Sequence, residues 1–175
     1  MLVEAAIVLP VTFFLLLTLI GGALYMRTYV TLNSAARSAA RAGSAAGQDP
    51  TADFAILSAL KRDASSLGGG QIQAISVYRT VPNTEPPAAC RIGPSSELKC
   101  NFYTAATLGT LLEANFGGAP SQRDSYWKAS DRRVGRTDPP DYIGVYIRAD
   151  AGALRLFGQP FIERWVSVRM EPIYE

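Results

Sequence analysis

The sequence predicts an α+β fold in which a long N-terminal hydrophobic helix and a second helix pack on a small antiparallel sheet. Three observations lead to this expectation. An uncharged apolar run opens the chain, an alanine-rich segment continues it, and apolar residues alternate in strand-like segments toward the C-terminus. We expect about three strands, with one apolar face of the sheet covered by the two helices.

The first helix is predicted from the stretch that follows Glu4. No charged residue occurs between Glu4 and Arg27, and the run from Ala5 to Met26 has about the length, roughly 20 residues, at which an α-helix crosses a bilayer. A cleaved secretory signal would begin with basic residues and have a shorter apolar part, so it fits poorly. We therefore predict a membrane-spanning helix over residues 1–27.

This helix is expected to continue out of the membrane over residues 28–47 and to end at about Ala46, before Gly47, because the segment is rich in alanine and free of proline. Small residues recur there at three- and four-residue spacings: Ala35, Ala36, Ala39, Ala40, Gly43 and Ala46. Such a face permits close packing. Two interpretations stay open, and different turns of the helix can follow different ones: packing on the protein's own sheet, with Arg37 and Arg41 solvated, or packing against another molecule.

Residues 48–175 are predicted to form an extracytoplasmic globular α+β domain. Its first element is a helix over about Thr51–Leu67, because apolar residues recur there with helical spacing. Asp49 or Thr51 is expected to cap the start of this helix. The three consecutive glycines at 68–70 mark its end.

The remaining elements of the domain are predicted from alternation and from breaker residues. Gln71–Val81 alternates like a strand, although one position leaves its register uncertain. Pro82–Lys99 has four prolines and is predicted to be a loop, and a short helix is expected over Thr104–Asn115. Tyr142–Ala149 and Phe161–Met170 are predicted to be the last two strands.

The two cysteines, Cys90 and Cys100, lie ten residues apart in a proline- and glycine-rich stretch. They fit either free buried thiols in a cytosolic protein or a disulfide in an oxidising compartment. The predicted membrane-spanning N-terminus favours the disulfide, which would add about 2–3 kcal/mol by restricting the unfolded chain.

Composition argues against several functions. The formal net charge is +2 with scattered basic residues, whereas nucleic-acid binding needs clustered ones. No histidine is present, which removes the commonest general base and transition-metal ligand. Asp124, Asp131, Asp138 and Asp141 are the only carboxylates suggestive of acid–base or Ca²⁺ chemistry, and their spacing matches no ligand loop. We expect no enzymatic activity, catalytic residue, metal site or cofactor.

Glu4 is the candidate functional residue, because a bare carboxylate entering a membrane costs about 2.5–3.5 kcal/mol on insertion scales. In one interpretation Glu4 simply lies at the water interface. In the other it pairs with the free amino terminus of a neighbouring subunit and sets the stagger between subunits, each charge compensating the other.

The segment Leu2-Val3-Glu4-Ala5-Ala6-Ile7-Val8-Leu9-Pro10 resembles the N-terminal signature of the TadE-like minor pilins of tight-adherence (Tad, type IVc) pili. The similarity includes Glu4, the Ala-Ile-Val-Leu series and Pro10. The Ala-Ala-Arg-Ala-Gly pattern at residues 39–43 and the terminal Val-Ser-Val-Arg-Met-Glu-Pro are also typical of that family. The resemblance is strong over about the first fifty residues. Most pilins carry the carboxylate one residue further from the mature N-terminus than Glu4 lies from Met1.

The resemblance implies a prepilin that a membrane prepilin peptidase processes, and that then joins identical or related pilin subunits in a helical filament. Its first helix would lie in the inner membrane before assembly and in the filament core afterwards. Met1, Glu4 and Pro10 would act in assembly, and the globular domain would be exposed at the cell surface for attachment. The alternative is a single-span envelope scaffold that does not polymerise.

Two further expectations concern single side chains. Pro10 removes the backbone hydrogen bond to the carbonyl of Ala6, so we predict a kink or local melting of the helix there. Aromatic residues in the domain are candidates for surface adhesion, although a core role is expected for those on strands: Tyr126, Trp127, Tyr142 and Tyr146.

Overall fold

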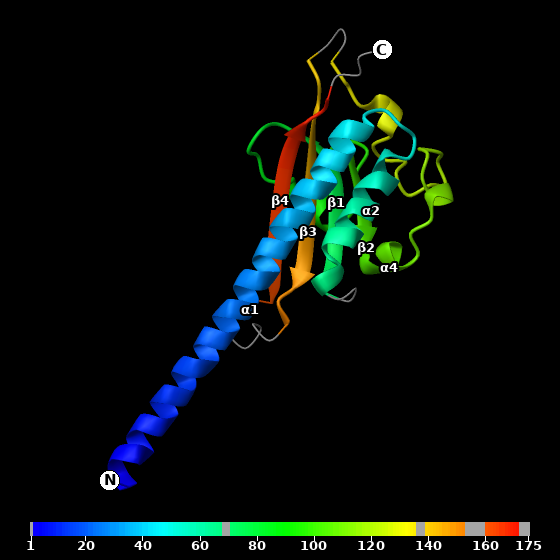
Figure 1. Ribbon diagram of the computed structural model, residues 1–175. Coiled ribbons are helices and arrows are strands. Elements are labelled where there is room, and N and C mark those ends of the chain that lie inside the picture. Colours follow the sequence, from blue (N-terminus) through cyan, green and yellow to red (C-terminus); the bar gives the residue numbers. More distant parts are fainter. Residues whose placement is uncertain (1, 68–70, 136–138, 153–159, 172–175) are drawn as a thin grey trace.

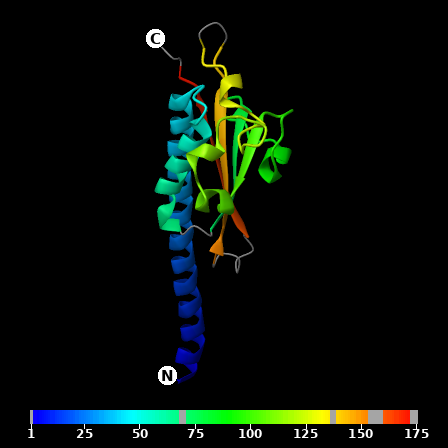
Figure 2. The same ribbon diagram turned by 90° about the vertical axis from the view of Figure 1, so that its right-hand side faces the viewer.

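The computed structural model describes residues 2–67, 71–135, 139–152 and 160–171, with only the backbone of residues 2–6. A four-stranded antiparallel sheet forms the centre of the domain. The helices α1 (Leu2–Ala46) and α2 (Ala52–Asp63) pack on one face of it, and α1 projects far beyond the domain (Figures 1 and 2). The predicted α+β architecture is therefore confirmed.

Helix α1 is one continuous element of 45 residues and ends where the sequence predicts. Gly47 follows it in the left-handed region, with φ of 58°. The Gly47 amide donates to the carbonyl oxygen of Gly43 at 3.2 Å, so the chain leaves the helix through a glycine that tolerates positive φ.

The expected local melting at Pro10 is not present. Helix α1 runs unbroken through this residue, and Figures 1 and 2 show no sharp bend in its projecting part. Proline removes only one hydrogen bond of the helical ladder. The neighbouring turns therefore keep their own bonds and hold the helical path.

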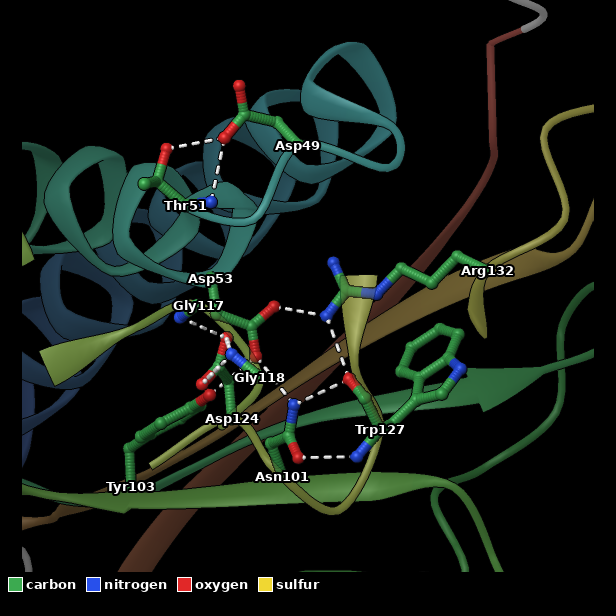
Figure 3. Close-up of polar contacts among 10 residues, drawn as sticks. All are labelled: Asp49, Thr51, Asp53, Asn101, Tyr103, Gly117, Gly118, Asp124, Trp127 and Arg132. Carbon is green, nitrogen blue, oxygen red and sulfur yellow. Dashed lines mark hydrogen bonds and ion pairs between the residues drawn. The ribbon is translucent and has the colours of Figure 1, made fainter. Parts of the chain in front are cut away.

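Helix α2 is shorter than predicted, because its last turn tightens into the 3₁₀ helix η1 (Ser65–Leu67). Thr51 occupies the N-cap position, but its side chain makes no capping hydrogen bond. Instead, the side chain of Asp49 holds this N-cap residue in place. Its Oδ1 accepts from the Thr51 amide at 2.7 Å and from the Thr51 hydroxyl at 2.6 Å (Figure 3). The Thr51 hydrogen bonds lower the pKa of Asp49.

The sheet has the strand order β2-β1-β3-β4, with all neighbours antiparallel. Its strands are β1 (Ile72–Thr80), β2 (Cys100–Thr104), β3 (Tyr142–Asp150) and β4 (Phe161–Arg169). Strand β2 was not predicted. It has only five residues and is buried for most of its length, so it lacks the alternation that predicts a half-exposed strand.

The short elements also differ from the prediction. The expected loop over Pro82–Lys99 contains the helix α3 (Ala88–Ile92). The expected helix over Thr104–Asn115 is two pieces, α4 (Ala105–Gly109) and the 3₁₀ helix η2 (Glu113–Asn115). A further 3₁₀ helix, η3, spans Ala129–Asp131. Pieces this short depend on tertiary contacts, because an isolated helix of fewer than about 12 residues is marginal in water.

The uncertain register of β1 has a structural cause. The pairing of β1 with β3 shifts between Ile72 and Ala74, as it does at a β-bulge, so the alternation of the sequence changes phase there. Both faces of β1 are also covered. Ile75 and Val77 belong to the main core with the helices, whereas Tyr78 packs on the opposite face with the two cysteines.

The small residues in the second half of α1 pack within the protein's own domain, as the first of the two interpretations of the sequence expects. The alanines at 35, 36, 39 and 40 are completely buried. A Cβ at Gly43 would lie 2.7 Å from the Cδ1 atoms of both Ile56 and Ile143, so only glycine permits this approach to α2 and β3. Arg37 and Arg41 lie on the exposed side of α1.

Candidate functional site: the projecting apolar half of the first helix

The projecting part of α1 carries an unusually large exposed apolar surface. Between Ile7 and Ile20, large apolar side chains are 45–70% exposed on all sides of the helix. They are Ile7, Val8, Leu9, Val11, Phe13, Phe14, Leu15, Leu16, Leu17, Leu19 and Ile20. Soluble monomers rarely expose such a continuous apolar surface, so this segment is built to contact lipid or other protein.

The few polar groups of the projecting half are satisfied within the helix. The Thr12 hydroxyl donates to the Val8 carbonyl oxygen at 2.8 Å, and the Thr18 hydroxyl donates to that of Leu15 at 2.8 Å. This pattern suits a lipid or protein interior, where no water can satisfy a hydroxyl group. In length and composition α1 suffices to cross a membrane, and none of its most apolar window is buried in the protein.

The residues predicted to act in assembly belong to this same segment. Glu4 lies in the backbone of α1, but its side chain is outside the described part of the structure, as is all of Met1. Pro10 is exposed within the apolar surface, where it lines a shallow hollow with Val11 and Phe14. Their roles in assembly remain predictions.

A buried polar cluster beneath α2 is the feature that sequence reasoning missed. Asp53 and Arg132 form an ion pair whose side chains are both completely buried (Figure 3). Asp53 Oδ2 also accepts from the Asn101 Nδ2 at 2.7 Å and from the Tyr103 hydroxyl at 2.5 Å. This cluster joins α2, β2 and the loop before β3. Apart from Asn101 and Tyr103, which both belong to β2, its members lie 29–79 residues apart in the sequence.

The surroundings of Arg132 hold it in place. Its guanidinium lies 4.6 Å from the centre of the Trp127 ring, and its Nη2 donates to the Trp127 carbonyl oxygen at 3.3 Å. Asn101 receives the Trp127 amide on its Oδ1 at 2.8 Å. Burial, followed by the charge and hydrogen bond of Asp53, raises the pKa of Tyr103 well above its usual value. The cluster is closed to solvent, so its role is structural.

The aspartates considered for chemistry do not form one site, and the two buried ones, Asp124 and Asp141, make structural contacts. Asp124 is buried and accepts the Gly117 and Gly118 amides at 3.0 Å (Figure 3). Asp141 is 3.0 Å from Arg79 Nε and 3.3 Å from Arg133 Nε. Asp131 is exposed in η3, and Asp138 lies outside the described residues. Among the described residues, no group of three or more His, Cys, Asp or Glu side chains could hold a metal ion.

Cys90 and Cys100 form a disulfide, with 6.0 Å between their Cα atoms, which confirms the second of the two interpretations. The bridge connects α3 to the start of β2 and packs against Tyr78 and Tyr146 on the sheet face away from α1. It therefore fastens the loop that covers this face, a part of the domain with few other apolar contacts.

The candidate adhesion aromatics are mostly part of the core. Trp127 is 1% exposed and Tyr146 is completely buried, and Tyr142 is half-buried at the start of β3. Tyr126 is the exposed one of the four, at 44%. The outer surface of the domain therefore presents one of the four predicted aromatics for contact.

Comparisons with known proteins bear on the N-terminal segment. Residues 1–41 match the family model described as TadE-like protein, a range that includes the projecting half of α1 and most of its buried half. Searches of curated proteins and of solved structures gave no significant match. Over its first 41 residues, this chain is therefore similar to TadE-like proteins.

Proposed function

We propose that this chain is a structural subunit, minor or principal, of a Tad-type type IV pilus. The observation that carries the proposal is the projecting half of α1, an apolar helix on a folded domain that leaves it uncovered. The TadE-like match over residues 1–41 supports an association with Tad pili. The role is structural and not catalytic.

In this proposal the same apolar surface serves two environments in turn. It lies in the inner membrane first, and after processing by a prepilin peptidase it packs against related subunits in the core of a filament. Both environments keep apolar side chains away from water, so the transfer does not expose them. Glu4 compensates the free amino group of a neighbouring subunit, and the globular domain faces outward for surface attachment.

The test begins with filaments sheared from the native cells. Mass spectrometry of the sheared fraction measures the abundance of the chain and its N-terminus, and abundance separates a principal from a minor subunit. Glu4→Ala is expected to leave the chain in the membrane but remove most of it from the filaments. The matched control is Glu97→Ala, which changes an exposed glutamate of the domain. Equal loss in both variants, or absence of the unaltered chain from filaments, contradicts the proposal.

One observation favours a second candidate, a single-span envelope scaffold that does not polymerise. The alanines at 35, 36, 39 and 40 are buried in the chain's own domain, so the second half of α1 does not offer them as a close-packing face to a neighbour. In this case the chain would occur only in the membrane fraction, in cells that still produce filaments.

A further inference from the structure

A group of aromatic and basic side chains surrounds α1 where it leaves the domain. We call Tyr25, Arg27, Tyr29 and Arg164 the membrane-proximal collar. The first three lie at the end of the uncharged apolar run of α1 or just after it, and the fourth comes from β4. Strand β3 ends and β4 begins at the end of the sheet nearest the projecting half of α1 (Figure 1).

Arg164 is the central residue of the collar. Its guanidinium carbon lies 3.6 Å from the centre of the Tyr29 ring. The side chain is on the face of β4 turned toward α1, because Arg164 pairs with Ile147 of β3, which belongs to the core shared with the helices. Its Nε is buried and has no hydrogen-bond partner within the described part of the chain, where Arg164 also makes no ion pair. A cation held by a ring and lacking a carboxylate is suited to an external anion.

A groove beside Arg164 gives such an anion a place. It has a volume of about 390 Å³ and is lined by Tyr25, residues 160–163 and Arg164. Glu163 is the acidic residue of this lining. It lies 3.9 Å from both Arg91 Nη1 and Arg148 Nε, so two other arginines offset its charge.

We propose that the collar binds the phosphate group of an anionic phospholipid at the outer surface of the membrane that α1 spans. The inference rests on the membrane-anchored stage of the proposed function. From Ala5 to Met26 the helix covers about 33 Å at 1.5 Å per residue, close to the hydrocarbon thickness of a bilayer. Tyr25, Arg27 and Tyr29 therefore lie at the level of the headgroups, where tyrosine and arginine are favoured.

The collar suits a headgroup better than a second copy of this chain. The part of a neighbouring α1 that would lie at the same depth in the membrane is its own residues 25–29, which include no acidic residue. A lipid phosphate is present at this depth on every side of the helix. Bound there, it offsets the charge of Arg164 and orients the domain on the membrane surface.

The experiment uses the full chain in nanodiscs that contain equal parts of phosphatidylglycerol and phosphatidylcholine. Native mass spectrometry measures the ratio of the two lipids that stay bound to the released protein. We expect retention of phosphatidylglycerol over phosphatidylcholine, and a fall of this preference by about fivefold in Arg164→Gln. Arg164→Lys keeps the charge and is expected to retain most of the preference. The matched control is Arg37→Gln, an exposed arginine further along α1, which should change nothing.

Equal retention of both lipids by the unaltered chain overturns the proposal, as does an equal fall in Arg164→Gln and Arg37→Gln. If instead the chain shows no lipid preference but self-associates, and Arg164→Gln abolishes the self-association, the collar binds a second copy of the chain. That result also overturns the proposal. Arg27→Gln, at an exposed position, replaces Arg164→Gln if that variant does not fold, with the same expected direction. The assay needs no filament, so its failure is distinct from absence of the chain from pili.

Discussion

The two halves of α1 belong to one continuous helix but meet opposite surroundings. The projecting half has large apolar side chains that no part of the described domain covers, whereas the second half has small side chains that the domain buries completely. The difference lies in side-chain size. Alanine and glycine let the helix axis approach α2 and the sheet closely, while leucine, isoleucine and phenylalanine at the same spacing would keep it away.

This contrast separates stability from function along one helix. Substitutions in the second half are expected to change the free energy of unfolding of the domain. Substitutions in the projecting half are expected to change only its contacts with lipid or other subunits. The following predictions test that separation with the full chain in detergent, unless stated otherwise.

The largest effect is expected at the buried cluster that joins α2 to β2 and to the loop before β3. Asp53→Ala leaves Arg132 as an uncompensated buried charge and should lower the free energy of unfolding by about 3–5 kcal/mol in urea titrations. Asp131→Ala, at an exposed position, is the control and should have little effect. Replacing both Asp53 and Arg132 with leucine should recover much of the loss, and no recovery would show that the charge is not the cause.

A pair of glycines in α1 tests the comparison directly. Gly43→Leu places a side chain where Ile56 and Ile143 already lie, and overpacking of this kind should cost about 3 kcal/mol of unfolding free energy. Gly22→Leu meets no atom within 4 Å of its Cβ and should leave domain stability unchanged. Near-ultraviolet circular dichroism during thermal unfolding reports both. Equal midpoints for the two variants would refute the assignment of the two halves.

The disulfide is expected to matter for the domain and not for the projecting helix. Changing both Cys90 and Cys100 to serine should lower the free energy of unfolding by about 2–3 kcal/mol, because the unfolded chain gains freedom. Partition of the chain into the membrane fraction should not change. An intact mass two hydrogens higher after reduction verifies the starting state, and unchanged stability would mean that packing alone holds α3.

A smaller effect is expected to distinguish two buried tyrosines. Tyr103→Phe removes the hydrogen bond to Asp53 and should cost about 1.5–3 kcal/mol, the range for bonds to charged groups. Tyr78→Phe should be nearly neutral, because within the described chain the Tyr78 hydroxyl is buried without a hydrogen-bond partner. Urea titrations at neutral pH compare them, and a larger loss for Tyr78→Phe would contradict this distinction.

Three buried tyrosines predict that the stability of the domain is sensitive to alkali. Burial raises the pKa values of Tyr78, Tyr103 and Tyr146 in the folded protein, so the folded state keeps protons that the unfolded state releases near pH 10. Their stabilising effect is complete below about pH 10 and declines above it, by up to about 1.4 kcal/mol per pH unit for each tyrosine. Tyr78→Phe should make this decline less steep, which unfolding midpoints measured across the alkaline range would check.

The sequence predicted much of the fold, and its failures have physical reasons. Helix α1 and strands β3 and β4 were predicted because long uniform patterns outweigh local ambiguity. Strand β2 was not predicted, because a short strand that is mostly buried shows no alternation of apolar and polar residues. The Asp53–Arg132 ion pair was not predicted, because a single sequence does not show which residues 79 positions apart come into contact.

By itself, the sequence determined that this chain has a membrane-length apolar helix, an alanine-rich continuation and a TadE-like start, because these features depend on consecutive residues. Only the tertiary structure decided that the alanines face the chain's own domain, that the cysteines are bridged and that Arg164 lies against Tyr29. These features depend on contacts between segments that are distant in the sequence, and such contacts form only when the whole domain folds.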